Sequence, residues 1–514
     1  MPKCNFRFLG AAVFGIALCM PAACSAKDKS GRNRSMETIV LDRQNTSPFN
    51  NGRFQGWGTS FCWWANRIGY SDELAEKAAE LFYDGDKGLG LNIIRYNIGG
   101  GDDPAHRHIK RTDSAVPGYL YKDAATGGFS YDWTADRNQR AVLKAAVKAC
   151  GQDVIVEAFS NSPPYFMTYS GCSSGAEDKS KNNLRDDQYE AFADYLATVI
   201  AHYKNAEGIA FQSVSPMNEP FTNYWGAFSD KQEGCHFDQG DSQSRMLLET
   251  AKALRSKGLA DVILCGTDET SVDVQSDSFA KLSPEAKDAV FRIDTHTYQG
   301  IGMKHLRGIA AENGKNLWMS EVDGGDIAGT NAGEMGAALW FAEKIISDMN
   351  GLMPSAWIMW QVIDNHVSAK GYNGNKDFGM PDTSRGYWGL AVCDHDRREI
   401  ILTKKYYAMA QFSRYIRPGC TLIASSRNTL AAYDSGKKRI VIAAVNDGGE
   451  TKKCLFDFSQ FEKTGDSAAV IRTSGSLADG ENCVPQPAVR VIKKTLKADL
   501  PANSITTFVV ESVF

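Results

Sequence analysis

The chain has 514 residues, a formal net charge of −4, 43% hydrophobic residues and 23% charged residues. This length exceeds one small domain, and the composition is ordinary for a soluble globular protein with a large core. The small net charge, without any dense block of Lys and Arg, argues against nucleic acid as a partner. The composition is compatible with an uncharged ligand. The 10 tryptophans would suit a sugar, because indole faces pack against sugar rings.

Residues 1–26 have the layout of a secretory signal peptide, with basic residues, then an apolar run over 8–20, then small residues. We therefore expect a secreted, cell-surface or periplasmic protein. Two processing routes remain open. Cleavage after Ala26 would release a soluble protein, whereas Pro21-Ala22-Ala23-Cys24 resembles a bacterial lipobox, in which a lipid on Cys24 would be the sole membrane attachment. The apolar run is too short to span a membrane.

A strand-helix alternation follows a linker over 27–36 and an N-terminal segment over 37–53. Apolar runs predict eight strands at 54–64, 92–98, 154–159, 209–215, 262–266, 291–297, 316–320 and 356–361. Helical periodicity covers 72–83, 137–150, 188–203, 244–257, 303–311, 333–349 and 404–415, with a less distinct helix within 278–289. Strands that are apolar throughout are typical of a parallel sheet buried on both faces. We therefore predict an α/β fold with a (β/α)8 barrel over 54–417.

The pattern changes after Arg417. Short alternating runs at 421–424, 429–433, 439–445, 468–472 and 505–511 are separated by Asp, Ser and Gly turns. They predict an antiparallel β-sandwich over 418–514, to which 38–41 could add a strand. The long segments 102–134 and 365–400 follow the second and eighth barrel strands, so we expect them to wall a cleft on the catalytic face.

Nine of the 12 cysteines lie beyond the predicted signal peptide. Because nine is odd, at least one thiol is free, and export makes some disulfides plausible. Cys172 and Cys235, both in polar loops, are our predicted pair. No spacing of Cys and His predicts a zinc site, and we expect no metal.

Two glutamates end predicted strands. Glu219 follows the fourth strand and precedes Pro220, which ends any regular element. Glu321 follows the seventh strand. The carboxyl ends of barrel strands face one cavity, so these two carboxyls can face one another, as the hydrolysis of a glycosidic bond requires.

Several motifs resemble those of a known family. Asn218-Glu219-Pro220, Glu321 and Gly56-Trp57-Gly58 resemble clan A glycoside hydrolases, specifically glycoside hydrolase family 30, over nearly the whole mature chain. That family joins a (β/α)8 barrel to a β-sandwich built from both chain ends. The sequences at 56–65, 95–100 and 160–164 most resemble its endo-β-1,6-galactanases.

The resemblance implies a retaining O-glycosyl hydrolase that cuts β-1,6-linked galactan. Glu219 would be the acid/base, with its pKa raised, and Glu321 the nucleophile. Asn218 would bind the sugar 2-hydroxyl, and Arg95 and Tyr298 would donate hydrogen bonds to Glu321, with Arg95 lowering its pKa. The predicted sugar-lining residues are Trp63, Trp64, Asn161 and Trp360. No organic cofactor is implied, and we expect a monomer.

Other readings remain open. The same family contains β-1,6-glucanases, xylanases and glucosylceramidases, and endo or exo action depends on loops that one sequence cannot place. A non-catalytic surface protein could bind glycans with the same cleft, although both glutamates are intact. A serine hydrolase using His296 and Asp268 lacks the Gly-x-Ser-x-Gly motif.

Overall fold

The structure is a computed structural model that describes residues 36–514 except 105, 124, 325–333 and 378–387. The predicted signal peptide, Cys24 and all of the predicted linker except Met36 lie outside the described residues. Among the helices of the described part, none combines the length and apolarity that a membrane span needs.

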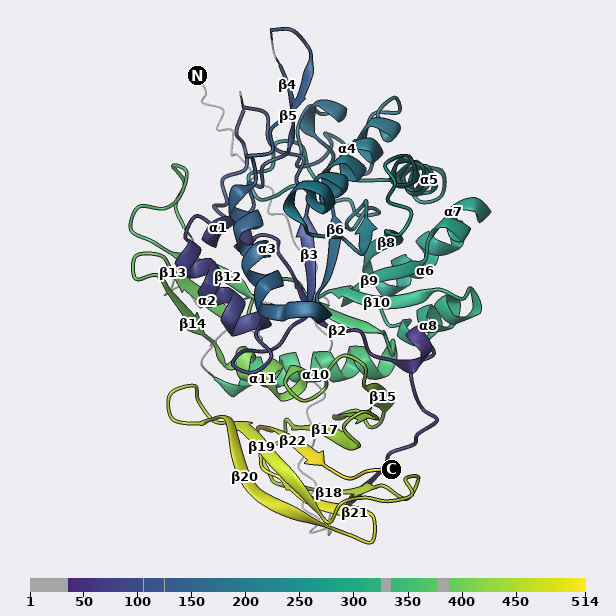
Figure 1. Cartoon of the computed structure of the whole chain (residues 1–514), viewed down its shortest axis with the longest axis vertical. Coiled ribbons are helices and arrows are strands. Elements are labelled where there is room, and N and C mark those ends of the chain that lie inside the picture. Colours follow the sequence, from purple (N-terminus) through teal and green to yellow (C-terminus); the bar gives the residue numbers. More distant parts are fainter. Residues whose placement is uncertain (1–35, 105, 124, 325–333, 378–387) are drawn as a thin grey trace, which may run out of the picture. The chain divides into compact units, whose positions relative to one another are not determined.

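Eight parallel strands close into a barrel, which confirms the predicted architecture (Figure 1). In chain order they are β2 Gly56–Ser60, β3 Ile93–Asn97, β6 Ile155–Phe159, β7 Ser213–Ser215, β8 Ile263–Ser271, β9 Arg292–Gln299, β10 Asn316–Glu321 and β11 Ala356–Met359. Their order around the barrel follows the chain, and β11 pairs with β2 to close it. Strand four is shorter than predicted, and strands five and six run farther toward the carboxyl ends that carry the site.

Helices surround the barrel. They are α1 Trp64–Ile68, α2 Asp72–Tyr83, α3 Arg137–Cys150, α4 Tyr189–His202, α5 Asp241–Ser256, α6 Val272–Lys281, α7 Pro284–Ala289, α8 Met303–Glu312, α10 Met335–Gly351 and α11 Lys404–Ser413. The indistinct helix expected within 278–289 is two helices, α6 and α7. Ser283 caps the second one by accepting a hydrogen bond from the Ala286 amide, and Pro284 fits the first helical position but not a helix interior.

The two long segments on the carboxyl side contain strands rather than loop alone. The first holds a hairpin of β4 Leu120–Lys122 and β5 Phe129–Tyr131. The second holds a three-stranded sheet of β12 Ile363–Val367, β13 Ala391–Asp394 and β14 Glu399–Leu402, in which β12 and β13 are parallel. The sequence reading missed these five strands, which are three to five residues long.

The C-terminal region forms a nine-stranded sheet ordered β1-β18-β21-β20-β19-β22-β17-β16-β15. The strands are β1 Glu37–Val40, β15 Thr421–Ala424, β16 Thr429–Asp434, β17 Arg439–Asn446, β18 Lys452–Asp457, β19 Ser467–Ser474, β20 Glu481–Ile492, β21 Thr495–Leu500 and β22 Ser504–Val510. Residues from both halves of this order share one apolar core. The sequence reading missed β18, β20 and β21, and β20 was hidden because Pro485 and Pro487 interrupt it.

Helix α11 joins the barrel to the C-terminal sheet. The Gln411 side chain donates to Thr473 Oγ1 at 2.8 Å, and Thr507 Oγ1 donates to the Gln411 carbonyl at 2.8 Å. The Lys404 ammonium donates to three carbonyl groups of the sheet region. These buried contacts tie the two parts of the described chain together.

The predicted disulfide is wrong. All nine cysteines within the described residues are free, including Cys172 and Cys235. Both are buried, and each sulfur has other partners: Cys172 Sγ accepts from the Phe228 amide, and Cys235 Sγ contacts the His236 carbonyl. Buried thiols packed in this way need no disulfide to stabilise their loops.

Candidate active site

The carboxyl ends of β7 and β10 bring Glu219 and Glu321 together. One carboxylate oxygen from each, together with a ring nitrogen of His296, lie within 4.8 Å of one another. Both glutamates are buried, with exposed fractions of 7% and 4%. The two opposed carboxyls are close enough for both to reach one sugar ring.

The backbone of Glu219 has an unusual conformation. Its φ of 46° lies in the left-handed region, which costs about 1–2 kcal/mol for a residue with a Cβ. Its amide donates to the Asp268 carbonyl at 2.8 Å, and its own carbonyl accepts from the Trp225 indole at 3.2 Å and the Thr222 hydroxyl at 2.9 Å. Hydrogen bonds on both sides hold this conformation, which turns the carboxyl toward the cavity beyond the strand end.

Each glutamate receives two donors. The Glu219 carboxyl is hydrogen-bonded to His296 Nδ1 at 3.0 Å and to the Tyr224 hydroxyl. The Glu321 carboxyl accepts from Arg95 Nη1 at 3.3 Å and from the Tyr298 hydroxyl at 3.0 Å. The structure therefore places Arg95 and Tyr298 against Glu321.

His296 was named in the sequence reading only for the disfavoured serine hydrolase, yet it lies between the carboxyls. Its Nδ1 is also 3.5 Å from Glu321 Oε1, and its Nε2 is 3.2 Å from Asp268 Oδ1. Strand β9 presents ionisable or hydroxyl side chains at every second position, at Arg292, Asp294, His296 and Tyr298. This period of two marks one face of a strand, and it is the signal that could have identified His296.

A buried ionic network lies beneath the two glutamates. Arg95 pairs with Glu157 at 3.0 Å and with Asp268 at 2.5 Å, and Arg292 pairs with Asp294 at 2.6 Å and with Glu157. Because every member is buried, the network holds its charges in fixed positions at the base of the site.

Burial raises the pKa of Glu321 to about 7, reinforced by the charge of Glu219, against the opposing effect of His296 and Arg95. Burial also acts to raise the pKa of Glu219, but the hydrogen bond and charge of His296 outweigh it, so the pKa is lower than usual. The neighbouring carboxylates Glu321 and Asp268 raise the pKa of His296 well above its ordinary value despite burial. These directions reverse our expectation for the two glutamates. For Glu219 the reason is His296, whose proton rests on the imidazole and stabilises the Glu219 carboxylate, whereas for Glu321 burial is the largest effect.

A cleft of about 420 Å³ opens over the two glutamates. Of the predicted sugar-contacting residues, Trp63, Asn218, Tyr298 and Trp360 line it, and the Trp63 and Trp360 rings pack edge to face at 4.8 Å. Trp63 Nε1 and Asn218 Oδ1 have no hydrogen-bond partner among the described residues. Both atoms are themselves buried, in side chains that line the cleft.

Two predicted lining residues lie elsewhere. Trp64 is fully buried in α1, donates to the Ser60 carbonyl at 2.9 Å and packs against Phe61 and Phe82. Asn161 lies outside the cleft lining and donates to Cys62 Sγ at 3.3 Å. The sequence reading did not separate Trp63 from Trp64, because neighbouring residues at the start of a helix face different sides.

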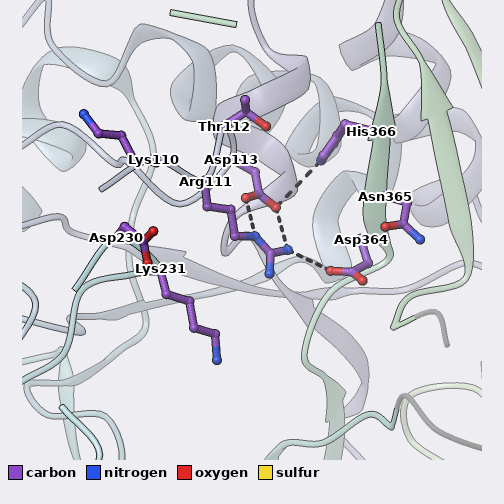
Figure 2. A pocket seen from close by; sticks show the side chains of 9 residues that line it. All are labelled: Lys110, Arg111, Thr112, Asp113, Asp230, Lys231, Asp364, Asn365 and His366. Carbon is purple, nitrogen blue, oxygen red and sulfur yellow. Dashed lines mark hydrogen bonds and ion pairs between the residues drawn. The ribbon is translucent and has the colours of Figure 1, made fainter. Parts of the chain in front are cut away.

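The sequence reading also missed several cleft residues, among them Arg111, Tyr224, Lys231, Asp364 and Trp388. Arg111 and Trp388 come from the two long segments, Asp364 lies on β12, and Tyr224 and Lys231 lie between β7 and α5. No periodic pattern in these stretches places a side chain. Three of them, Arg111, Lys231 and Asp364, also line a neighbouring pocket of about 330 Å³ (Figure 2). In that pocket Arg111 bridges Asp113 at 2.6 Å and Asp364 at 2.8 Å. The two hollows therefore adjoin one another.

Comparison with known proteins agrees with this geometry. The family model described as O-Glycosyl hydrolase family 30 matches residues 41–279. An endo-beta-1,6-galactanase from Hypocrea rufa is 29% identical, covering 94% of this chain and 96% of that protein. The chain is thus similar to glycoside hydrolase family 30.

Other similar proteins agree. An exo-beta-1,6-galactobiohydrolase from Bifidobacterium longum subsp. longum is 28% identical across 89% of this chain, which covers 38% of that longer protein. The solved catalytic domain of a family 30 xylanase C from Talaromyces cellulolyticus superposes with a TM-score of 0.68 at 21% identity, covering 92% of this chain and all of that one. The comparisons therefore support a glycoside hydrolase, and the chain has the barrel and β domain of this solved relative.

Proposed function

We propose that the protein is a retaining endo-β-1,6-galactanase. The observation that carries the mechanism is the separation of the two carboxyls. Retaining enzymes hold them about 5–5.5 Å apart, whereas inverting enzymes need about 6.5–9.5 Å to admit a water molecule. The oxygens of Glu219 and Glu321 that lie within 4.8 Å of one another match the shorter separation.

In the first step Glu321 attacks the anomeric carbon and forms a glycosyl ester, while Glu219 protonates the departing glycosidic oxygen. In the second step Glu219 accepts a proton from water, which attacks the same carbon and releases Glu321. Arg95 and Tyr298, which donate to both oxygens of Glu321, stabilise its carboxylate before attack and after release.

His296 couples the two steps. In the free protein its proton is stabilised by the negative charge of Glu321. When Glu321 forms the ester that charge disappears, so the imidazolium becomes a stronger acid. The imidazolium proton then moves along the 3.0 Å hydrogen bond to the Glu219 carboxylate, which passes it on to the leaving oxygen.

The choice of galactan rests on the relatives. A relative that matches 94% of this chain and 96% of its own length is an endo-beta-1,6-galactanase, and a second relative also acts on β-1,6-linked galactose units by its name. The adjoining pocket of Figure 2 extends the cleft, and this arrangement favours binding along a chain and hence endo action. We also propose export through residues 1–26, with lipidation of Cys24 as one of two processing routes and a monomeric enzyme.

The test is incubation with β-1,6-galactan, β-1,6-glucan and glucuronoxylan, with product lengths read by chromatography. We expect galacto-oligosaccharides of mixed length from the first polymer alone. Disaccharides as the sole products would indicate exo action. Glucose oligomers would refute galactan as the substrate. Proton NMR of the first products gives the mechanism, because a retaining enzyme releases the β-anomer before mutarotation. Mass spectrometry of the exported protein distinguishes a lipidated Cys24 from cleavage after Ala26.

A further inference from the structure

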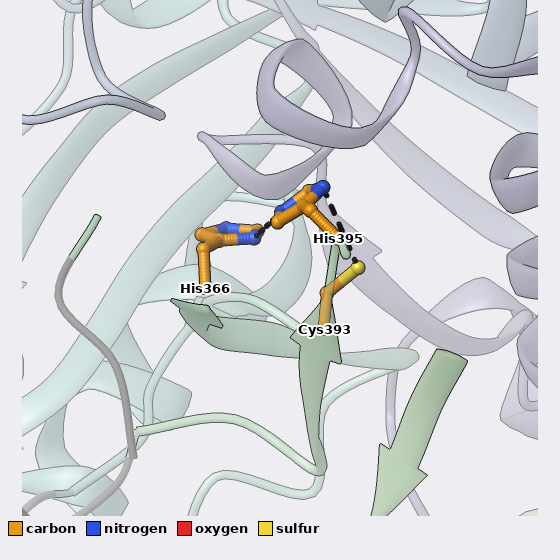
Figure 3. Close-up of side chains that lie close together, drawn as sticks. All are labelled: His366, Cys393 and His395. Carbon is orange, nitrogen blue, oxygen red and sulfur yellow. Dashed lines mark hydrogen bonds between the residues drawn. The ribbon is translucent and has the colours of Figure 1, made fainter. Parts of the chain in front are cut away.

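A second cluster of metal-binding side chains lies outside the catalytic centre (Figure 3). His366 on β12, Cys393 on β13 and His395 just beyond β13 are buried, and one donor atom from each lies within 4.8 Å of the others. His366 Nδ1 lies 3.0 Å from His395 Nε2, and Cys393 Sγ lies 3.9 Å from His395 Nδ1. A thiol and two imidazoles are thus gathered where no catalytic role uses them.

The backbone explains why these three residues meet. Strands β12 and β13 are parallel neighbours in a register that pairs His366 with Cys393. Cys393 and His395 are two positions apart, so they project from the same face of the extended chain. The cluster therefore depends on strand pairing, which is more rigid than loop geometry.

The outer contacts of both imidazoles suit metal ligands. His366 Nε2 is buried without a hydrogen-bond partner among the described residues. The Asp113 carboxylate faces it, with Oδ2 at 3.9 Å. The Tyr70 hydroxyl lies 3.1 Å from His395 Nδ1. Ligating histidines usually direct the second ring nitrogen at a carboxylate or another oxygen, as both of these do. Tyr70 is 40% exposed, which gives an ion a route from solvent.

We propose that His366, Cys393 and His395 bind a single Zn²⁺ ion. His366 would ligate through Nδ1 and His395 through Nε2, each at about 2.0–2.1 Å, with Cys393 Sγ at about 2.3 Å. The ion replaces the hydrogen bond between the two imidazoles, and the proton of that bond moves to His395 Nδ1, which then donates to the Tyr70 hydroxyl. The thiol proton leaves to solvent, and His366 Nε2 keeps its proton toward Asp113. Water fills the fourth position.

Charges near the cluster permit a cation. Two guanidiniums act on His366, those of Arg67 and Arg111. Asp377 pairs with Arg67 through two hydrogen bonds, at 3.0 Å and 2.6 Å, and Arg111 pairs with the two carboxylates of Asp113 and Asp364. Three carboxylates thus face two guanidiniums, and the remaining negative charge favours a positive ion beside His366.

The ion would connect β12 to β13 beside the catalytic cleft. Asp364 precedes His366 on β12 by two residues, and it lines the cleft and pairs with Arg111. A bound ion would therefore stabilise the sheet that presents Asp364, without taking part in hydrolysis. This proposal does not depend on the identity of the sugar substrate.

The experiment is metal binding by the full chain. Protein stripped with a chelator is saturated with zinc chloride, dialysed against metal-free buffer and analysed for bound zinc by mass spectrometry. Cobalt is added to a parallel sample, because a thiolate ligand gives a charge-transfer band in the near ultraviolet. The variants are Cys393→Ser, His366→Gln and His395→Gln. Cys265→Ser is the matched control, since Cys265 belongs to a different buried cluster with Glu157 and Asp294.

We expect the wild type and the Cys265→Ser control to retain one zinc ion per chain, show the cobalt band and melt at a higher temperature with zinc. The three cluster variants should lose all of these effects. Absence of bound zinc in the wild type would overturn the proposal without any variant. Equal zinc retention by Cys393→Ser, or a cobalt band lost only in Cys265→Ser, would overturn it as well.

Discussion

His296 Nδ1 lies 3.0 Å from Oε1 of Glu219 at the centre of the active site. The opposite ring nitrogen is 3.2 Å from Asp268, a carboxylate whose pKa Arg95 holds well below its usual range although burial opposes this. The imidazole is thus fixed at both ends by acidic groups. The proton of the Glu219–His296 pair controls whether Glu219 can act as an acid.

Replacing His296 with Asn should lower kcat about 100-fold, because the proton supply to Glu219 is lost, with little change in KM. The charge of His296 lowers the pKa of Glu321, so its removal should raise that pKa and move the acid limb of the kcat/KM profile to higher pH. The profile of His296→Asn is compared with that of His305→Asn, an exposed residue of α8. A fall in kcat with an unmoved profile would mean that His296 is only structural.

Replacing either glutamate should separate their roles. Glu321→Gln should lose about 1,000-fold or more of its activity on every substrate, because no nucleophile remains. Glu219→Gln should keep measurable activity on an aryl galactoside with a good leaving group, which needs no proton, while losing activity on galactan. Initial rates on both substrates are the measurement. If both variants kept the same fraction of activity on the aryl galactoside, the assignment of Glu219 as acid/base and Glu321 as nucleophile would be contradicted.

Glu321→Gln should also change stability with pH. The pKa of Glu321 is about 7 in the folded chain, whereas an ordinary glutamate has a pKa of 4.5. Between these values the unfolded chain releases a proton that the folded chain retains, so the free energy of unfolding falls as pH rises through this window. Gln has no proton to lose in this range. The free energy of unfolding of the variant should therefore exceed that of the wild type by up to about 3 kcal/mol above pH 7, and this difference should vanish near pH 4.5. Denaturant titrations at several pH values measure it. The exposed Glu76→Gln serves as control, and a difference independent of pH would refute this account.

The neighbouring tryptophans should respond differently to substitution. Trp63→Phe removes part of a ring that lines the cleft, together with an N–H that has no hydrogen-bond partner among the described residues, and should raise KM about 2–10-fold with little effect on folding. Trp64→Ala should instead lower the free energy of unfolding by about 3–5 kcal/mol, because it leaves a cavity between α1 and Phe82. Kinetics and chemical denaturation of both variants test this pair. A larger KM effect from Trp64→Phe than from Trp63→Phe would show that the two positions were assigned wrongly.

The sequence by itself determined the barrel and the position of its two glutamates. Strands that are apolar over five or more residues, and helices with a clear period, reflect local burial, so Glu219 and Glu321 could be assigned to strands four and seven. Strand β20, interrupted by Pro485 and Pro487, and the short strands β12 and β13 lacked such a pattern.

Only the tertiary structure decided which side chains meet. It separated Trp63 in the cleft from Trp64 in the core, left Cys172 and Cys235 unpaired, and placed His296 between Glu219 and Glu321. It also reversed the expected pKa directions of the two glutamates. The physical reason is that burial and electrostatic interaction depend on distances between residues far apart in the chain, whereas sequence patterns record only which face of a single element each residue occupies.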